Sequence, residues 1–166
     1  YNKTNSFSTD DCVVNIPSGA LYDTLKFEYR KSPGTSLMYS DIHSIHYNTT
    51  PLHKAYSVSI RPTKIPSDRE SKMLLVQLNA NMSKTPVNSS FRDGFLKADV
   101  LTFGKFFVGI DTISPTITAS GLQPGADLTG RKEIRFRIKD DFSGIKSYEC
   151  LIDGKWALME YDQKNE

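Results

Sequence analysis

Residues 56–61 read YSVSIR, and the alternation of apolar and polar side chains in this stretch decides the fold class. The tyrosine, valine and isoleucine share one face of an extended chain, and the polar residues share the other, which predicts a half-buried β-strand. Residues 23–30 (DTLKFEYR) repeat the pattern. Residues 73–78 (MLLVQL) form a nearly continuous apolar run, which is typical of a strand buried on both faces.

Two more strands are expected further along the chain, at residues 95–103 and 106–110. The segments RDG at 92–94 and FGK at 103–105 resemble turns, because glycine tolerates a positive φ that strains other residues. We therefore expect the two strands to form a terminal hairpin. No apolar i, i+3, i+4, i+7 pattern runs for three helical turns, so the sequence predicts an all-β fold.

A change of domain is expected at residues 111–116 (DTISPT), where one strand ends, a proline follows and another strand begins. Sandwich domains are often joined by short segments of this kind. The sequence therefore predicts two consecutive β-sandwich domains of immunoglobulin-like type. The first spans residues 1–113 and the second spans residues 114–166.

Four strands are expected in the second domain. They span residues 116–120, 133–139, 145–152 and 156–161. Residues 133–139 (EIRFRIK) alternate sharply, and their two isoleucines and phenylalanine are predicted to face inward. Asp153-Gly154 is a strong hairpin signal. Because a seven-stranded sandwich needs about 100 residues and only about 50 follow the boundary, we expect this domain to be incomplete.

Charge and hydropathy favour few partners. The formal charge is +2 and the basic residues are spread along the chain, so no footprint for nucleic acid is visible. No apolar stretch approaches the roughly 20 residues of a membrane-spanning helix.

The chain starts with YNKTN, which has no initiator methionine and no apolar core of a signal peptide, so we expect this chain to be cut from a longer precursor. Cys12 and Cys150, in different predicted domains, are expected to be buried free thiols and not a disulfide.

The three histidines, His43, His46 and His53, do not form a metal-binding pattern. If residues 37–48 are a strand, His43 and His46 are three positions apart and point to opposite faces. Each is expected to be a solvent-facing or hydrogen-bonded strand residue. Serine, histidine and aspartate are all present, but no G-x-S-x-G elbow activates a serine, so no hydrolase triad is predicted.

The acidic pairs Asp10-Asp11 and Asp140-Asp141 are interpreted as turn or cap residues. Adjacent carboxylates on a strand face opposite sides, which suits neither a glycosidase pair nor a proton-sharing dyad. Residues 140–144 (DDFSG) carry hard oxygen ligands that suit calcium, but aspartate and serine in turns bond their own backbone, and the turn role is favoured. The sequence therefore predicts no catalytic, cofactor-binding or metal-binding residue in this chain.

The aromatic side chains raise the alternative of a platform for sugar rings. Packing in the core or at its rim is favoured for most of the set, which comprises Tyr22, Tyr29, Tyr39, Tyr47, Tyr56 and Trp156. Tyr39 and Tyr47 lie in a mixed pattern and are the two candidates for an exposed position. Segments 48–50, 81–83 and 88–90 match the eukaryotic N-glycosylation pattern, which often arises by chance.

Several motifs together carry a resemblance. Residues 111–117 (DTISPTI), 139–145 (KDDFSGI) and 152–156 (IDGKW) resemble the immunoglobulin-like region downstream of the catalytic domain in lysostaphin/LytM-like zinc endopeptidases of Bacteroides and relatives. Residues 16–22 (IPSGALY) and 103–106 (FGKF) look like the segment between those two domains. The IPSGAL motif is also similar to the β-domain shared by ankyrins and netrin receptors.

The resemblance implies a function without catalysis for this segment. Zinc endopeptidases of this type carry H-x-x-x-D and H-x-H ligand motifs, and neither is present here. The resemblance therefore implies a non-catalytic accessory region of an exported cell-wall metalloendopeptidase, located in the periplasm or cell envelope. Its partners would be its own catalytic domain in cis and peptidoglycan or another glycan. DTL at 23–25 and DTI at 111–113 resemble the O-glycosylation sequence of exported proteins in Bacteroides relatives, which agrees with export. The alternative is an adhesin or glycan-binding surface module.

Overall fold

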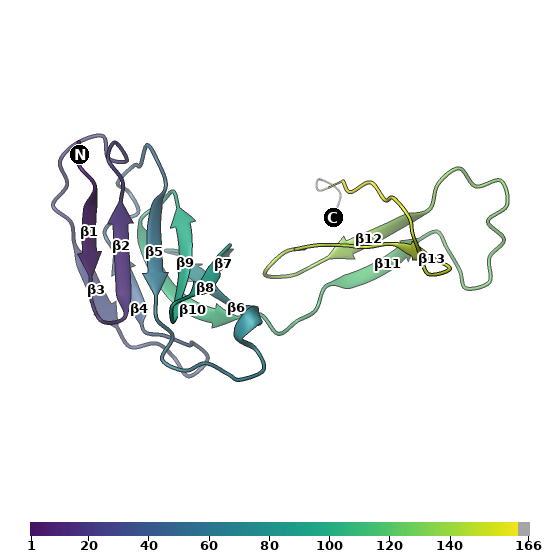
Figure 1. Cartoon of the computed structure of the whole chain (residues 1–166), viewed down its shortest axis with the longest axis horizontal. Coiled ribbons are helices and arrows are strands. Elements are labelled where there is room, and N and C mark those ends of the chain that lie inside the picture. Colours follow the sequence, from purple (N-terminus) through teal and green to yellow (C-terminus); the bar gives the residue numbers. More distant parts are fainter. Residues whose placement is uncertain (163–166) are drawn as a thin grey trace. The chain divides into compact units, whose positions relative to one another are not determined.

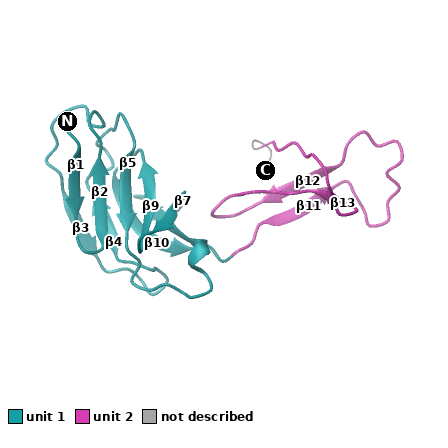
Figure 2. Cartoon of the chain, in the orientation of Figure 1, with its two compact units in different colours: residues 1–112 teal, residues 113–166 magenta. Residues whose placement is uncertain are grey.

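The computed structural model describes residues 1–162, and its regular structure is almost entirely β-strand, which confirms the all-β prediction (Figure 1). The chain divides into two compact units, residues 1–112 and 113–166 (Figure 2). The predicted boundary falls one residue later, and residues 163–166 of the predicted second domain lie outside the described residues. Among residues 1–162 the one helical element is a three-residue 3-10 turn, η1 (Glu70–Lys72), which is far too short to cross a bilayer.

The first unit is a sandwich of two five-stranded antiparallel sheets. In the first sheet the strand order is β1 (Asn5–Ser8), β2 (Cys12–Ile16), β5 (Tyr56–Ile60), β9 (Phe95–Val100) and β8 (Ser90–Arg92). In the second sheet the order is β3 (Tyr29–Ser32), β4 (Ile42–Ile45), β10 (Gly104–Ile110), β6 (Met73–Leu78) and β7 (Lys84–Val87).

The core of the first unit lies between these sheets. Tyr56, Val58 and Ile60 of β5 are each at most 1% exposed, as their alternation predicted. Phe106 and Val108 of β10 are fully buried in the same apolar cluster. Because side chains of both sheets form one cluster, the sheets pack face to face as in other β-sandwiches.

Strand β6 is buried on both faces, which confirms the prediction from its continuous apolar run. Leu75 belongs to the core between the sheets, whereas Val76 is 1% exposed on the opposite face. On the neighbouring strand, Gly109 leaves the space that the Val76 side chain occupies. A Cβ at Gly109 would lie 2.7 Å from Val76 Cγ2, closer than unstrained packing allows.

Replacing Gly109 with alanine should lower the free energy of unfolding of the first unit by about 1–3 kcal/mol, because the added methyl overpacks this contact. Val76→Ala removes the obstructing methyls, so the G109A/V76A double variant should be more stable than the sum of the two single effects predicts. Urea denaturation followed by circular dichroism measures the free energy of unfolding of the unchanged chain, the two single variants and the double variant. If the effects of the two single substitutions add up to that of the double variant, the contact is contradicted.

The prediction that residues 95–110 form a hairpin is wrong. Strand β9 pairs with β5 in the first sheet, whereas β10 pairs with β4 and β6 in the second. Between them the chain turns a corner, where Phe103 is fully buried and the Tyr56 hydroxyl donates a hydrogen bond of 3.2 Å to the Thr102 carbonyl. A glycine and a short loop fit a crossing between sheets as well as a hairpin, so the local pattern does not distinguish them.

Two predicted strands are shorter in the structure. Of residues 23–30, only the last two belong to a strand, because the partner strand β4 has four residues and pairs with Tyr29–Ser32. Leu25 and Phe27 still pack against the core, so the alternation predicted burial correctly without predicting pairing. Of residues 37–48, the strand covers Ile42–Ile45.

Residues 113–162 of the second unit contain four strands. They are β11 (Thr116–Ser120), β12 (Arg135–Lys139), β13 (Leu151–Ile152) and β14 (Lys155–Trp156). β11 pairs with β12, and β13 pairs with β14 through a two-residue turn. Asp153 and Gly154 have φ values of 50° and 77°, as the predicted hairpin turn requires. The last two strands are much shorter than the predicted segments 145–152 and 156–161.

The predicted inward face of residues 133–139 is not covered. Ile134 and Phe136 are 37% and 46% exposed, and Ile117, on the same face of the paired strand, is 72% exposed. A two-stranded ladder buries an apolar face only when a second layer lies over it. The described residues of the second unit form two separate two-stranded ladders, so this apolar face stays exposed.

Candidate functional site

A pocket of about 300 Å³ opens on the first unit, over the second sheet. Four separate segments line it: residues 28–30, 44–48, 78–82 and 104–105. We call it the Tyr47 pocket. Its lining residues are Glu28, Arg30, Ser44, His46, Tyr47, Asn48, Leu78, Asn79, Ala80, Met82, Gly104 and Lys105.

The floor of the Tyr47 pocket is a row across three neighbouring strands. Ser44 on β4 is paired directly with Arg30 on β3 and with Lys105 on β10. Paired residues of an antiparallel ladder point to the same face of the sheet. The next residues along, Ile45 and Phe106, are fully buried in the core, so this row faces outward. A short serine between two long cationic side chains leaves the floor hollow.

One wall is formed by Tyr47 and Glu28. The Tyr47 side chain is 51% exposed, and its hydroxyl donates a 2.7 Å hydrogen bond to Glu28 Oε2. This bond to a carboxylate raises the pKa of Tyr47, so the phenol keeps its proton. Arg30 approaches the same carboxylate oxygen at 3.7 Å. The ring is thus held in place by a bond at its hydroxyl while much of its surface faces solvent.

His46 supports this wall from behind. It lies just past β4 with a φ of 50°, and its ring packs against Tyr47 and Phe103 at centroid distances of 5.0 and 5.2 Å. The ring nitrogen Nδ1 is buried without a hydrogen-bond partner among the described residues. Burial lowers the pKa of His46, so the ring is neutral near pH 7.

The opposite wall is the tight loop between β6 and β7. The Asn79 side-chain amide donates to Ser83 Oγ at 2.8 Å and to Thr85 Oγ1 at 2.9 Å. The Met82 amide donates to the Asn79 carbonyl at 3.0 Å, and Met82 has a φ of 64°. These bonds hold the loop in one conformation beside the pocket.

His43 lies apart from the pocket, in the core. Its side chain is fully buried on β4, and a 2.8 Å hydrogen bond joins Nδ1 to the Tyr29 hydroxyl, as expected for a hydrogen-bonded strand residue. Burial lowers the pKa of His43, and Nε2 has no partner among the described residues. His53 is exposed and contacts the Tyr22 ring. Within residues 1–162 no group of three or more His, Cys, Asp and Glu side chains is placed to hold a metal ion.

Asp10 and Asp11 lie in the turn between β1 and β2, as predicted. Asp11 accepts hydrogen bonds of 2.8 Å from Thr9 Oγ1 and from Lys31 Nζ. Partial burial alone would raise the pKa of Asp11, but the bonds from Lys31 and Thr9 outweigh it and the pKa is lowered. The Asp11 carboxylate therefore links the turn between β1 and β2 of the first sheet to Lys31 on β3 of the second sheet.

Both cysteines are free thiols. Cys12 is fully buried, as predicted, and burial raises the pKa of its thiol to about 12, so it is unreactive at neutral pH. Cys150 is only half-buried, which differs from the prediction because the second unit has no deep core.

The aromatic residues divide differently from the prediction. Of the two candidates for an exposed position, Tyr47 is exposed but Tyr39 is half-buried, and Tyr22 and Trp156 are exposed at 64% and 66%. Tyr56 is buried and Tyr29 is half-buried, as expected for packed residues. Tyr39 is covered because Lys64 Nζ lies 4.9 Å from its ring centre.

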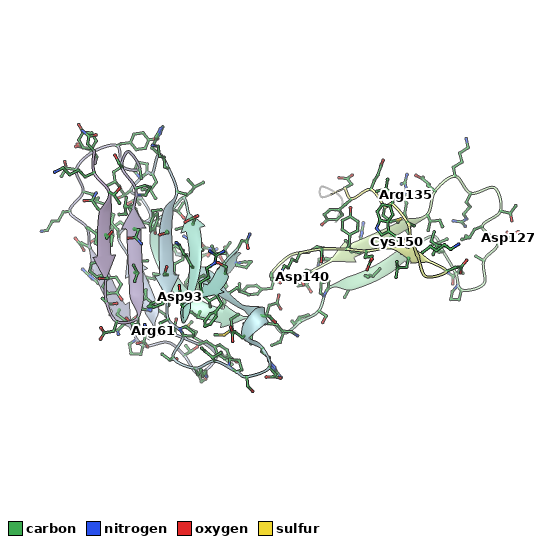
Figure 3. The ribbon with its side chains drawn as sticks, viewed as in Figure 1. Arg61, Asp93, Asp127, Arg135, Asp140 and Cys150 are labelled. Carbon is green, nitrogen blue, oxygen red and sulfur yellow. The ribbon has the colours of Figure 1, made fainter. Side chains whose placement is uncertain are left out.

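The acidic turn of residues 140–144 is held by its own backbone, as predicted. Asp140, directly after the end of β12 (Figure 3), accepts hydrogen bonds from the amides of Phe142 and Gly144 at 2.9 and 2.8 Å. Asp141 forms an ion pair of 2.7 Å with Lys139. Both carboxylates are therefore engaged in local contacts.

Replacing Asp140 with alanine should expose the Phe142 and Gly144 amides to solvent exchange, because each loses its acceptor. Asp140→Asn keeps the Oδ1 acceptor and should retain most of the protection. Amide hydrogen exchange followed by NMR, with and without millimolar calcium, measures both effects. A calcium-dependent gain in protection would contradict the turn role.

One comparison with known protein families matches the first unit. The family model of the Zu5-like domain matches residues 1–111, which is nearly the whole first unit. The match includes the motifs at 16–22 and 103–106, and its description names no peptidase. No curated protein matches the chain. Since the model covers two thirds of its residues, this chain belongs to the Zu5-like domain family.

Proposed function

We propose that this chain is a non-catalytic accessory region of an exported bacterial protein, and that it positions or spaces the catalytic domain of a peptidoglycan metalloendopeptidase. One observation carries the proposal. Three side chains with catalytic potential are engaged in structural contacts: His43 with Tyr29 in the core, Asp11 with Lys31 and Thr9, and Asp140 with its own turn. Within residues 1–162 these contacts stabilise the two β-units and do not pair these three groups as an acid and a base.

Two further features support the proposal. The DDFSG and DGKW segments, on which the resemblance to peptidase-associated domains rests in part, form a turn held by Asp140 and a short hairpin. Thr24 and Thr112, in the two segments that resemble O-glycosylation sequences, are exposed, which suits modification outside the cytoplasm. We therefore place the chain in the periplasm or cell envelope.

The proposal is tested in the parent chain. Replacing residues 1–166 by a flexible Gly/Ser linker should reduce hydrolysis of intact peptidoglycan sacculi several-fold and leave hydrolysis of a short soluble peptide unchanged. Separately, the 166-residue chain alone should release no fragments from sacculi. Equal hydrolysis of sacculi by both parent chains would remove the positioning role, and release by the isolated chain would show that it is catalytic.

A second candidate function, a glycan-binding surface module, is favoured by the Tyr47 pocket. An exposed aromatic ring beside carboxylate and amide side chains can bind a polyhydroxylated ligand, because the ring packs against its apolar face and the polar groups bond its hydroxyls. The volume of about 300 Å³ is at the lower end of the range for small-ligand sites, which suits one sugar ring or a short saccharide.

A further inference from the structure

We propose that the Tyr47 pocket binds an acidic saccharide, with a sugar ring over Tyr47 and a ring carboxylate between Arg30 and Lys105. The inference rests on the second candidate function and names its ligand class. Two observations on the page carry it: the outward row of cations on the floor, and the restrained but exposed aromatic ring on the wall.

The floor provides two cations on either side of a gap. Arg30 and Lys105 are each paired in register with Ser44, so they lie two strand spacings apart, or roughly 10 Å between Cα atoms. Both side chains are long enough to converge over the serine. Within residues 1–162 no carboxylate forms an ion pair with Lys105, and the Arg30 side chain is 80% exposed at its contact with Glu28. Both cations can therefore take a further anionic partner.

The balance of charge in the pocket selects a singly charged ligand. Arg30 and Lys105 carry two positive charges, and Glu28 carries one negative charge at the rim. The net charge of the lining is therefore +1, since His46 is neutral near pH 7. A single carboxylate balances it, whereas a phosphate dianion would leave a net charge of −1 in the pocket.

The wall provides the contacts that a sugar ring needs. The hydrogen bond to Glu28 fixes the hydroxyl end of Tyr47, so the face of the ring needs little ordering on binding. Within residues 1–162 no side-chain hydrogen bond is accepted by Glu28 Oε1 or by the side-chain oxygen of Asn79, so both oxygens can accept from hydroxyl groups of a ligand. Asn48 adds an exposed amide at the rim.

The test uses the full 166-residue chain and two monosaccharide probes that differ at one carboxyl group: the methyl glycoside of galacturonate, with a single negative charge, and its neutral methyl ester. Titration by NMR should show shifts at Tyr47, Ser44 and Lys105 with both probes, and the acid should bind about fivefold more tightly or better. The advantage of the acid should shrink as sodium chloride is raised, because the cations are exposed.

Variants distinguish the contribution of the two cations to binding from that of the Tyr47 ring. Lys105→Gln and Arg30→Gln should each weaken binding of the acid about threefold to fivefold and leave the ester unaffected. Tyr47→Ala should weaken both probes. The matched controls are Lys97→Gln, an exposed lysine on β9 of the other sheet, and Tyr22→Ala, an exposed tyrosine outside the pocket, and both should bind like the unchanged chain.

The outcomes distinguish the inference of an acidic saccharide from the broader function of glycan binding. If the ester binds as tightly as the acid, or if K105Q behaves like K97Q, the carboxylate inference is wrong and the glycan-binding function stands. If neither probe shifts the pocket residues, the acidic-saccharide inference is overturned, and binding of a neutral glycan in its place would preserve the broader function. If acetate or inorganic phosphate displaces the acid at equal concentration, the pocket is an anion site and not a saccharide site.

Discussion

Replacing Phe106 with alanine should lower the free energy of unfolding of the first unit by about 3–5 kcal/mol. The ring is fully buried between the two sheets, on the strand that lies at the centre of the second sheet. A domain of this size is typically stable by about 5–15 kcal/mol, so the variant should lose roughly a fifth or more of its stability. Circular dichroism should record a fall in melting temperature of at least about 12 °C.

The matched control for this prediction is Phe136→Ala. Both phenylalanines lie in β-strands, but Phe136 is 46% exposed on β12. We expect this variant to change the stability of the chain by less than about 1 kcal/mol. A loss as large as that of F106A would show that another layer covers β12.

The stability of the first unit should fall as the pH drops below 6.5, mainly through His43. Burial lowers the pKa of this ring in the folded chain, whereas the unfolded chain keeps a pKa near 6.5. Below pH 6.5 the unfolded state therefore binds more protons than the folded state, so acid favours unfolding. The slope approaches about 1.4 kcal/mol per pH unit and ends where the folded ring itself becomes protonated.

The groups around His43 define the variants for this test. Tyr29 contacts the ring directly, and Asp11, Lys31 and Asp41 act on it through their charges. The double variant Y29F/H43F removes both hydrogen-bonding partners together, which costs less than leaving one of them unpaired in the core. Urea denaturation between pH 7 and 5 should show a smaller pH dependence in this variant.

Two other histidines complete the comparison. His46 contributes with the same sign, because burial lowers its pKa as well, so some pH dependence should remain in Y29F/H43F. The exposed His53 provides a matched control, and H53N should keep the full pH dependence. An unchanged slope in Y29F/H43F would contradict the role of His43.

Local patterns in the sequence predicted much of the first unit correctly. The period-two alternation of residues 56–61 and the apolar run of 73–78 give both the strands and their burial, because each depends only on neighbouring residues. The turn predicted at residues 92–94 is also correct: Asp93 and Gly94 both adopt a positive φ between β8 and β9.

Pairing between strands could not be predicted in the same way. Nothing in residues 95–110 distinguishes a hairpin from a crossing between sheets, and residues 23–28 alternate like a strand although no partner lies beside most of them. The Tyr47 pocket was missed for the same reason. Tyr47 was a candidate for an exposed position, but Arg30, Ser44 and Lys105 come together only through the register of three strands.

The position of β10 also sets the order in which the first unit can be built. This strand is the last of the unit in sequence, yet it lies between β4 and β6 in the second sheet. When synthesis has reached residue 100, nine of these strands are complete in the chain. The strand that lies between β4 and β6 in the second sheet is still missing. Closure of the second sheet must wait for residues 104–110, so folding is dominated by late, long-range pairing, and earlier intermediates present open strand edges to chaperones or to other chains.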